Sequence, residues 1–132
     1  MIISSEIFGF DIPFGCEGTF IAGANGVDIG YGQANTTAIV ADCGEPGSAA
    51  VLCNDYVSDG YDDWFLPSRD ELDAINANEA KLTTISNGWY VTSSQQNADL
   101  AWRVYFWPQP SLTEPEGVFK SIGERAMAMR IF

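Results

Sequence analysis

The chain contains no histidine and few basic residues. Zinc sites built from cysteine and histidine are therefore not expected, nor are serine or cysteine nucleophiles activated by histidine. Six Lys and Arg residues stand against eighteen Asp and Glu residues, which gives a formal net charge of -12. This charge would repel nucleic acid and anionic membrane surfaces, so we expect no nucleic-acid partner.

Long apolar runs are also missing, and none approaches the about 20 residues of a membrane span. We therefore expect no membrane insertion. The first residues, Met1 to Glu6, lack the basic segment that is typical of a signal peptide. The chain is expected to be a domain of a longer secreted protein, or to reach the outside without a signal peptide, as a virion protein would. Its expected location is extracellular, at a cell surface or on a virion.

Cysteine is scarce and odd in number, with Cys16, Cys43 and Cys53 and no C-x-x-C spacing. A bond between Cys43 and Cys53 would close a loop of about ten residues and stabilise the fold by about 3 kcal/mol. Alternatively, all three cysteines are small buried apolar side chains. The sequence leaves both arrangements open.

An apolar fraction of 46% over 132 residues, with 13 glycines, favours one folded domain that is rich in turns. Its clearest local signal lies at residues 60–72. There Ser68 and Glu71 form a capping box, in which each side chain bonds the backbone N–H of the other residue. This pattern predicts a helix over residues 69–78 with Leu72 on its buried face.

The same stretch carries a resemblance to a known family. Residues 60–72 read Gly-Tyr-Asp-Asp-Trp-Phe-Leu-Pro-Ser-Arg-Asp-Glu-Leu. They resemble the signature of the Lcl C-terminal domain family, a domain of unknown function named after a bacterial collagen-like adhesin. Residues 30–40 (Gly-Tyr-Gly-Gln-Ala-Asn-Thr-Thr-Ala-Ile-Val) and 49–53 (Ala-Ala-Val-Leu-Cys) are similar to two further segments of that family. The structural signature positions are Trp64, Leu66, Pro67, Ser68, Glu71 and Leu72.

The resemblance implies a fold and a type of role. It implies one C-type-lectin-like α+β domain over residues 1–132, with two short helices and a mainly antiparallel twisted sheet with long loops. The first and last strands pair in such folds. A surface-binding role follows from the resemblance, whereas no general activity does.

Local patterns predict the remaining elements. Alternating apolar residues from Phe8 to Phe14 predict a first strand. Asn35 or Thr36 can cap a helix that ends near Asp42, and Ser48 can cap the next one. Three further strands are expected, at residues 89–94, 100–107 and 126–132.

Residues 100–107 have two different faces. Leu100, Trp102, Val104 and Phe106 form the expected core face, while the opposite face carries arginine, tyrosine and tryptophan. These three residue types dominate binding hot spots, and aromatic rings stack on sugars. The alternative is that this face covers a second core layer or a subunit contact. The candidate ligand-binding residues are Tyr90, Gln95, Gln96, Asn97, Arg103, Tyr105 and Trp107.

A group of aspartates raises the question of calcium, which prefers oxygen ligands. Asp59, Asp62 and Asp63 are the candidate metal ligands. Their spacing does not match an EF-hand, and aspartates that form turns explain the same residues. No other cofactor is expected.

The sequence predicts no catalytic residues, so the chain is not expected to be an enzyme. The hypothesis is a surface-recognition module, such as an adhesin or receptor-binding tip, that binds glycans or host-surface proteins. It would act as a homotrimer or attached to a larger fibre or virion. One alternative is a phage or bacterial protein-binding module that is diversified in its C-terminal third. Another is a structural domain that decorates a capsid or fibre.

Overall fold

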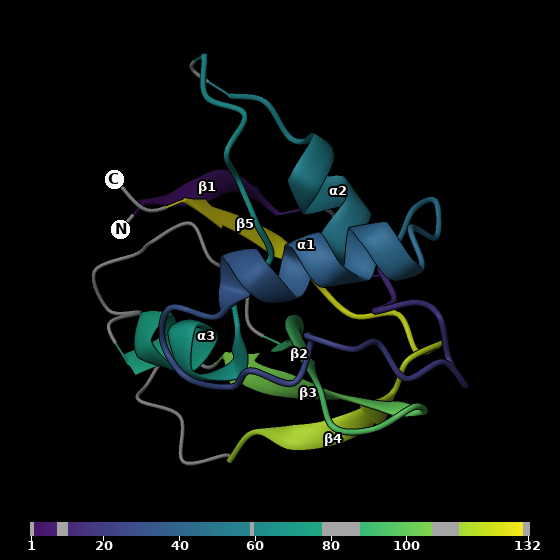
Figure 1. Cartoon of the computed structure of the whole chain (residues 1–132). Coiled ribbons are helices and arrows are strands. Elements are labelled where there is room, and N and C mark those ends of the chain that lie inside the picture. Colours follow the sequence, from purple (N-terminus) through teal and green to yellow (C-terminus); the bar gives the residue numbers. More distant parts are fainter. Residues whose placement is uncertain (1, 8–10, 59, 78–87, 107–113, 131–132) are drawn as a thin grey trace.

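A computed structural model describes residues 2–7, 11–58, 60–77, 88–106 and 114–130. Within these residues the chain is a small α+β domain with three short helices and five strands (Figure 1). In chain order the elements are β1 (Ile2–Ile7), α1 (Gly32–Asp42), α2 (Ala49–Asp55), α3 (Arg69–Ala77), β2 (Gly88–Gln95), β3 (Leu100–Phe106), β4 (Glu116–Phe119) and β5 (Met127–Arg130). The described residues contain no helix that is both long and apolar enough to cross a membrane.

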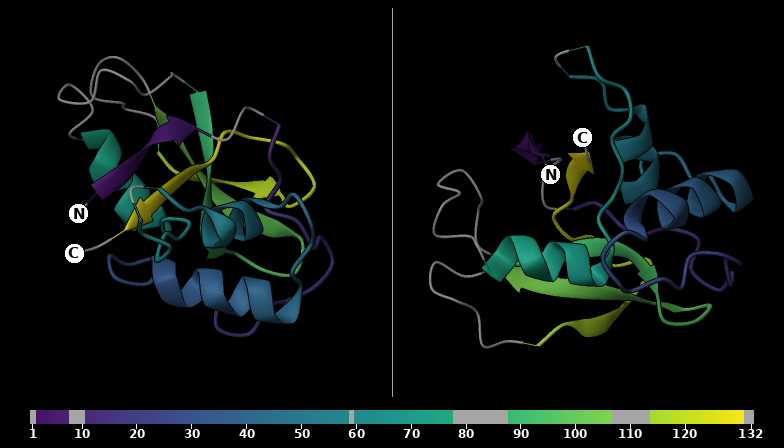
Figure 2. Two further views of the ribbon diagram at one scale, coloured as in Figure 1. Left: turned by 90° about the horizontal axis from the view of Figure 1, so that it is seen from above. Right: turned by 60° about the vertical axis from the view of Figure 1, so that its left-hand side comes forward.

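The strands form two separate antiparallel sheets. One has the order β2-β3-β4, and the other pairs β1 with β5, so the first and last strands are neighbours as expected. Phe65 extends the second sheet, because its N–H donates to the Met129 carbonyl at 2.8 Å and its carbonyl accepts the Met129 N–H at 2.9 Å. α3 packs on one face of the three-stranded sheet, and α1 lies against α2 (Figures 1 and 2).

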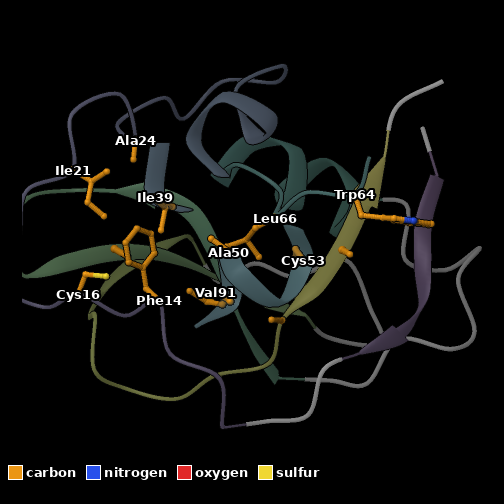
Figure 3. Close-up of a cluster of buried hydrophobic side chains, with 14 residues drawn as sticks. Phe14, Cys16, Ile21, Ala24, Ile39, Ala50, Cys53, Trp64, Leu66 and Val91 are labelled. Carbon is orange, nitrogen blue, oxygen red and sulfur yellow. The ribbon is translucent and has the colours of Figure 1, made fainter. Parts of the chain in front are cut away.

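Two apolar clusters form the core. The first joins Phe14, Ile21 and Ile39 to the small face of α2 and to Trp64, which is only 5% exposed (Figure 3). The Trp64 indole N–H donates to the Tyr61 carbonyl at 3.1 Å. The second cluster lies beneath α3, where β2, β3 and β5 meet. Its members are Phe65, Leu72, Ile75, Tyr90, Val104, Phe106, Met127 and Met129.

The local predictions succeed for α3, β2 and β3, whereas the first strand and the start of α1 differ. β1 lies at Ile2–Ile7, before the strand that was predicted from Phe8 to Phe14. Of that predicted strand the structure describes residues 11–14, and these form one isolated bridge, between Ile12 and Glu124. α1 begins at Gly32 instead of Asn35, because the side chains of Asn35 and Thr36 bond to other segments from inside the helix. Ser48 is the N-cap residue of α2 as predicted, although its side chain makes no cap hydrogen bond, and the three described helices exceed the expected count of two.

The cysteine pairing also differs. The disulfide joins Cys16 to Cys43, whose Cα atoms lie 6.3 Å apart, so neither a Cys43–Cys53 bond nor three unpaired cysteines is found. Cys53 points from α2 into the core, where its thiol donates to the Met127 carbonyl at 3.5 Å. Burial raises the pKa of this thiol. Cys43, at the end of α1, instead reaches the irregular segment that follows Phe14.

Removing the disulfide should destabilise the fold strongly. The bond spans 27 residues of sequence, and a closed loop of that size stabilises a fold by about 3–4 kcal/mol on the chain-entropy model. We expect the double variant Cys16→Ser, Cys43→Ser to lose that amount in urea unfolding. Reductant should lower the midpoint of the parent protein and leave that of the variant unchanged. Equal midpoints for the oxidised and reduced parent protein would contradict the assignment.

Candidate binding groove beside Trp102

Glu71 is the centre of the region that builds the groove. The capping box is confirmed, since the Ser68 N–H donates to Glu71 Oε1 at 2.8 Å and the Glu71 N–H donates to Ser68 Oγ at 3.3 Å. The same buried carboxylate also accepts the N–H groups of Gly30 at 3.0 Å and Gly32 at 3.1 Å. One side chain therefore joins the first turn of α3 to the first turn of α1.

The segment around Gly32 fits this carboxylate closely. A Cβ atom at Gly32 would lie 2.3 Å from Glu71 Oε1 and 2.7 Å from the Phe65 ring, so no larger residue fits without movement. Asn35 Nδ2 donates to the Gly26 carbonyl at 2.7 Å, and Thr36 Oγ1 accepts the Leu66 N–H at 3.0 Å. Two of the three segments that resemble the family signature thus contact each other directly.

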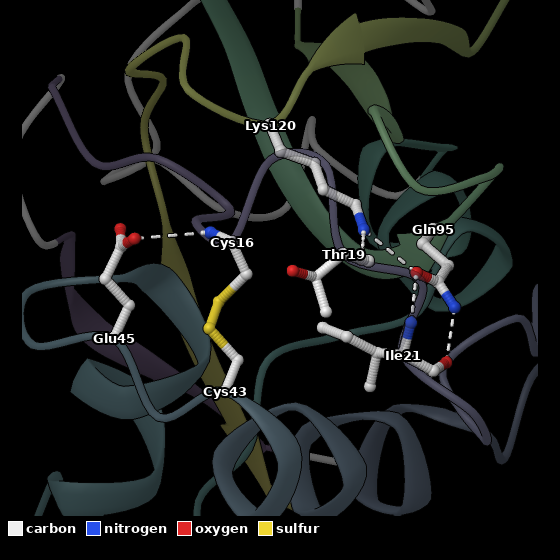
Figure 4. The surroundings of a disulfide bond; sticks show 7 residues. All are labelled: Cys16, Thr19, Ile21, Cys43, Glu45, Gln95 and Lys120. Carbon is white, nitrogen blue, oxygen red and sulfur yellow. Dashed lines mark hydrogen bonds between the residues drawn. A yellow bond between two sulfur atoms is a disulfide. The ribbon is translucent and has the colours of Figure 1, made fainter.

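A second set of buried polar side chains holds the irregular segment at residues 15–31 (Figure 4). The Gln95 amide accepts the Ile21 N–H at 3.1 Å and donates back to the Ile21 carbonyl. Lys120 is fully buried, and its Nζ donates to the Thr19 carbonyl at 2.8 Å and to Gln95 Oε1 at 2.9 Å. Burial lowers the pKa of this ammonium group. The sequence reading missed Lys120, because a lone lysine carries no local sign of being buried.

The groove lies between the first turns of α3, the middle of β3 and the segment that enters β4. It has a volume of about 270 Å³. Its lining residues are Arg69, Asp70, Asp73, Trp102, Glu114 and Pro115. Trp102 was predicted to be in the core. It is half-buried instead, because α3 covers only the later part of this strand face, at Val104 and Phe106.

Arg69 fixes the geometry of the groove wall. Its guanidinium carbon lies 4.7 Å from the centre of the Trp102 ring, and its Nε donates to Asp70 Oδ1 at 2.9 Å. The Arg69 backbone N–H donates to Ser94 Oγ at 3.0 Å, which anchors the start of α3 to β2. On this side of the groove the guanidinium therefore lies over one face of the indole, and the start of the helix that carries it is anchored to β2.

The groove is acidic. Three carboxylates line it beside one guanidinium. The pKa of Asp73 lies above its usual range, first because of partial desolvation and then because of the negative charges of Asp70 and Glu114, while Arg69 opposes the shift. The arrangement can accept hydrogen bonds from hydroxyl or ammonium groups at its rim, and it can stack a flat ligand face on its wall.

Arg103 and Tyr105 are two of the predicted ligand-binding residues. They lie on the other face of β3, beside Trp89. The Trp89 and Tyr105 rings meet edge to face at 5.0 Å, and the Arg103 guanidinium carbon lies 3.9 Å from the centre of the Trp89 ring. Arg103 Nη1 donates to Glu124 at 2.6 Å, and Nη2 donates to Glu116. This guanidinium is therefore already engaged within the chain.

The other predicted ligand-binding residues do not join that cluster. Tyr90 is fully buried against Phe106, and Gln95 is 2% exposed, so both are structural here. Gln96 and Asn97 lie at the β2–β3 turn, where Asn97 Oδ1 accepts two backbone N–H groups. The length of β3, about 20 Å, separates this turn from Tyr105. Trp107 lies outside the described residues.

The aspartates considered for calcium do not converge in the described part of the chain. Asp63 accepts two hydrogen bonds from Arg130, at 2.6 and 3.1 Å, and these lower the pKa of its carboxyl group. Asp62 is exposed, and Asp59 lies outside the described residues. Among the residues that are described, no three His, Cys, Asp or Glu side chains form a group that could hold a metal ion.

Comparison with known proteins adds no assignment: no family model, curated protein sequence or solved structure matches this chain. The resemblance to the Lcl C-terminal domain family stays a prediction.

Substituting Glu71 by glutamine should destabilise the domain by about 2–3 kcal/mol in urea unfolding. Both carboxylate oxygens accept backbone N–H groups, so a glutamine would have to direct its NH₂ group at a backbone donor. The control is Asp70→Asn, the same chemical change at a partly exposed ion pair one residue away, for which we expect less than about 1 kcal/mol. Equal effects of the two variants would contradict the role given to Glu71.

Proposed function

We propose that this domain is a non-enzymatic surface-recognition module that binds a glycan in the groove beside Trp102. The observation that carries the proposal is the chemistry of the groove. A half-buried indole offers a flat apolar wall, and carboxylates with one guanidinium surround it. Sugar rings present apolar C–H faces that stack on aromatic rings, and their hydroxyl groups bond to carboxylates and guanidinium groups.

The way the groove is supported favours binding. Its lining residues come from a helix and a strand, and the helix is fixed at its start by the Glu71 carboxylate and by Ser94. A site on rigid elements loses little conformational entropy when a ligand binds. The buried contacts of Glu71 therefore serve recognition indirectly, by keeping Arg69 and Asp73 in place.

The resemblance at residues 30–40, 49–53 and 60–72 supports the wider setting of the proposal. In this setting the domain is an adhesin or receptor-binding tip with a C-type-lectin-like fold, at a cell surface or on a virion, as a homotrimer or on a larger fibre. The Cys16–Cys43 disulfide supports a location outside the reducing cytosol. Calcium is not required by the proposal, because the groove residues bind the ligand directly.

A second candidate function is protein binding through the cluster of Trp89, Arg103 and Tyr105. Trp89 and Tyr105 are half-buried, and all three residue types are common in binding hot spots. The internal ion pairs of Arg103 weigh against this candidate, because a partner would have to compete with Glu116 and Glu124. The groove is therefore the preferred site.

A glycan array with the parent protein and two matched variants tests the proposal. Trp102→Ala should reduce binding to any positive glycan at least tenfold, which corresponds to about 1.4 kcal/mol, because the stacking wall is lost. Trp89→Ala, a tryptophan removed from the opposite face of the sheet, should leave glycan binding unchanged. Thermal melting of both variants would show that they fold.

Three results would count against the proposal. The first is an array with no positive glycan. The second is unchanged binding by Trp102→Ala. The third is loss of binding only in Trp89→Ala, which would move the site to the opposite face.

A further inference from the structure

The groove carries negative charge that the described residues do not neutralise. Asp70 is paired with Arg69 at 2.9 Å. No ion pair is formed by Asp73 or Glu114 within the described part of the chain, although both line the same groove. Two carboxylates of exposed residues thus form no ion pair with another described residue beside the indole, although the charge of Arg69 acts on Asp73 from a distance. Bringing a cation between them would relieve their mutual repulsion.

The wall of the groove also suits a cation. The Arg69 guanidinium already lies over the Trp102 ring at 4.7 Å, within the range of a cation–π contact. The π face of an indole and the carboxylates of the same groove both attract positive charge. A neutral sugar can bond the two carboxylates through its hydroxyl groups, but it does not neutralise their charge.

We propose that the ligand of the groove is an amino sugar, whose ring stacks on Trp102 and whose protonated amine is held by Asp73 and Glu114. This inference rests on the proposed glycan binding and narrows the class of glycan. The groove volume of about 270 Å³ limits the deeply held part of the ligand to about one sugar unit. The charged groups that face Asp73 are Asp70 and Arg69 on its own helix and Glu114 on the segment before β4.

The proposal has a consequence for pH. The pKa of the Asp73 carboxyl group is raised, so this group takes up a proton at a higher pH than an ordinary aspartate. Binding of the amine is strongest while Asp73 is ionised and the amine is protonated. Affinity should therefore fall as the pH is lowered through the pKa of Asp73, and this fall should begin above the usual aspartate range near 3.9.

The experiment compares two probes of the same length, a glucosamine oligomer with protonatable amines and an N-acetylglucosamine oligomer in which each amine is replaced by a neutral acetamide. Calorimetry at pH 6 and low salt should show at least tenfold tighter binding of the glucosamine oligomer. Asp73→Asn should remove most of this preference and shift the onset of the acid-side loss of affinity. The control is Asp55→Asn, which makes the same change in net charge at the exposed end of α2.

Each contrary outcome identifies what fails. Equal affinity for the two oligomers, together with loss of binding in Trp102→Ala, would overturn the amino-sugar assignment and leave glycan binding intact. If Asp55→Asn and Asp73→Asn weaken binding of the glucosamine oligomer equally, the oligomer is attracted by the net charge of the chain alone. This result would rule out the groove as the binding site. Tighter binding of a lysine-rich peptide than of the glucosamine oligomer would assign the groove to a protein ligand. An array without any positive glycan would remove the proposed function itself.

Discussion

The fold depends on one constraint, which is that the backbone of an irregular segment must find hydrogen-bond partners inside the protein. Residues 15–31 form neither helix nor strand, yet several of these residues are buried. Side chains from distant elements bond to the backbone of this segment: Gln95 bonds both polar groups of Ile21, Lys120 bonds the Thr19 carbonyl, and Glu71 bonds the Gly30 N–H. Buried polar residues in this domain therefore replace the ladder hydrogen bonds that a sheet would supply.

This solution has an energetic cost, since burying a charge is unfavourable unless it is well bonded. Glu71 meets the condition with three N–H donors, and Lys120 meets it with two oxygen acceptors and with the Phe14 ring, 5.0 Å away. Such groups stabilise one arrangement of the segment, because any other arrangement would leave them unpaired. The bond from the Gly30 N–H to Glu71 also ties this segment to the start of α3, which forms one wall of the groove.

Sequence reasoning succeeds where the cause lies within a few residues. The capping box at Ser68 predicts the start of α3, and alternation predicts β3, because each pattern acts over one turn or one strand. It fails where distant segments decide. Nothing near Cys43 shows that its partner is Cys16, and nothing near Gln95 shows that its amide will bond to the backbone of Ile21. Trp102 was misplaced for the same reason, because α3 determines how much of the strand face is buried.

The pairing of β1 with β5 has a mechanical consequence. Ile2 lies opposite Arg130 in antiparallel register, so the two strands enter and leave the fold at the same edge (Figure 1). A pulling force between these two points would separate the hydrogen-bonded pairs one after another, as a zipper opens, instead of shearing all of them together. The hydrogen bonds between Phe65 and Met129 lie on the other edge of β5, and they would be the next to carry the load.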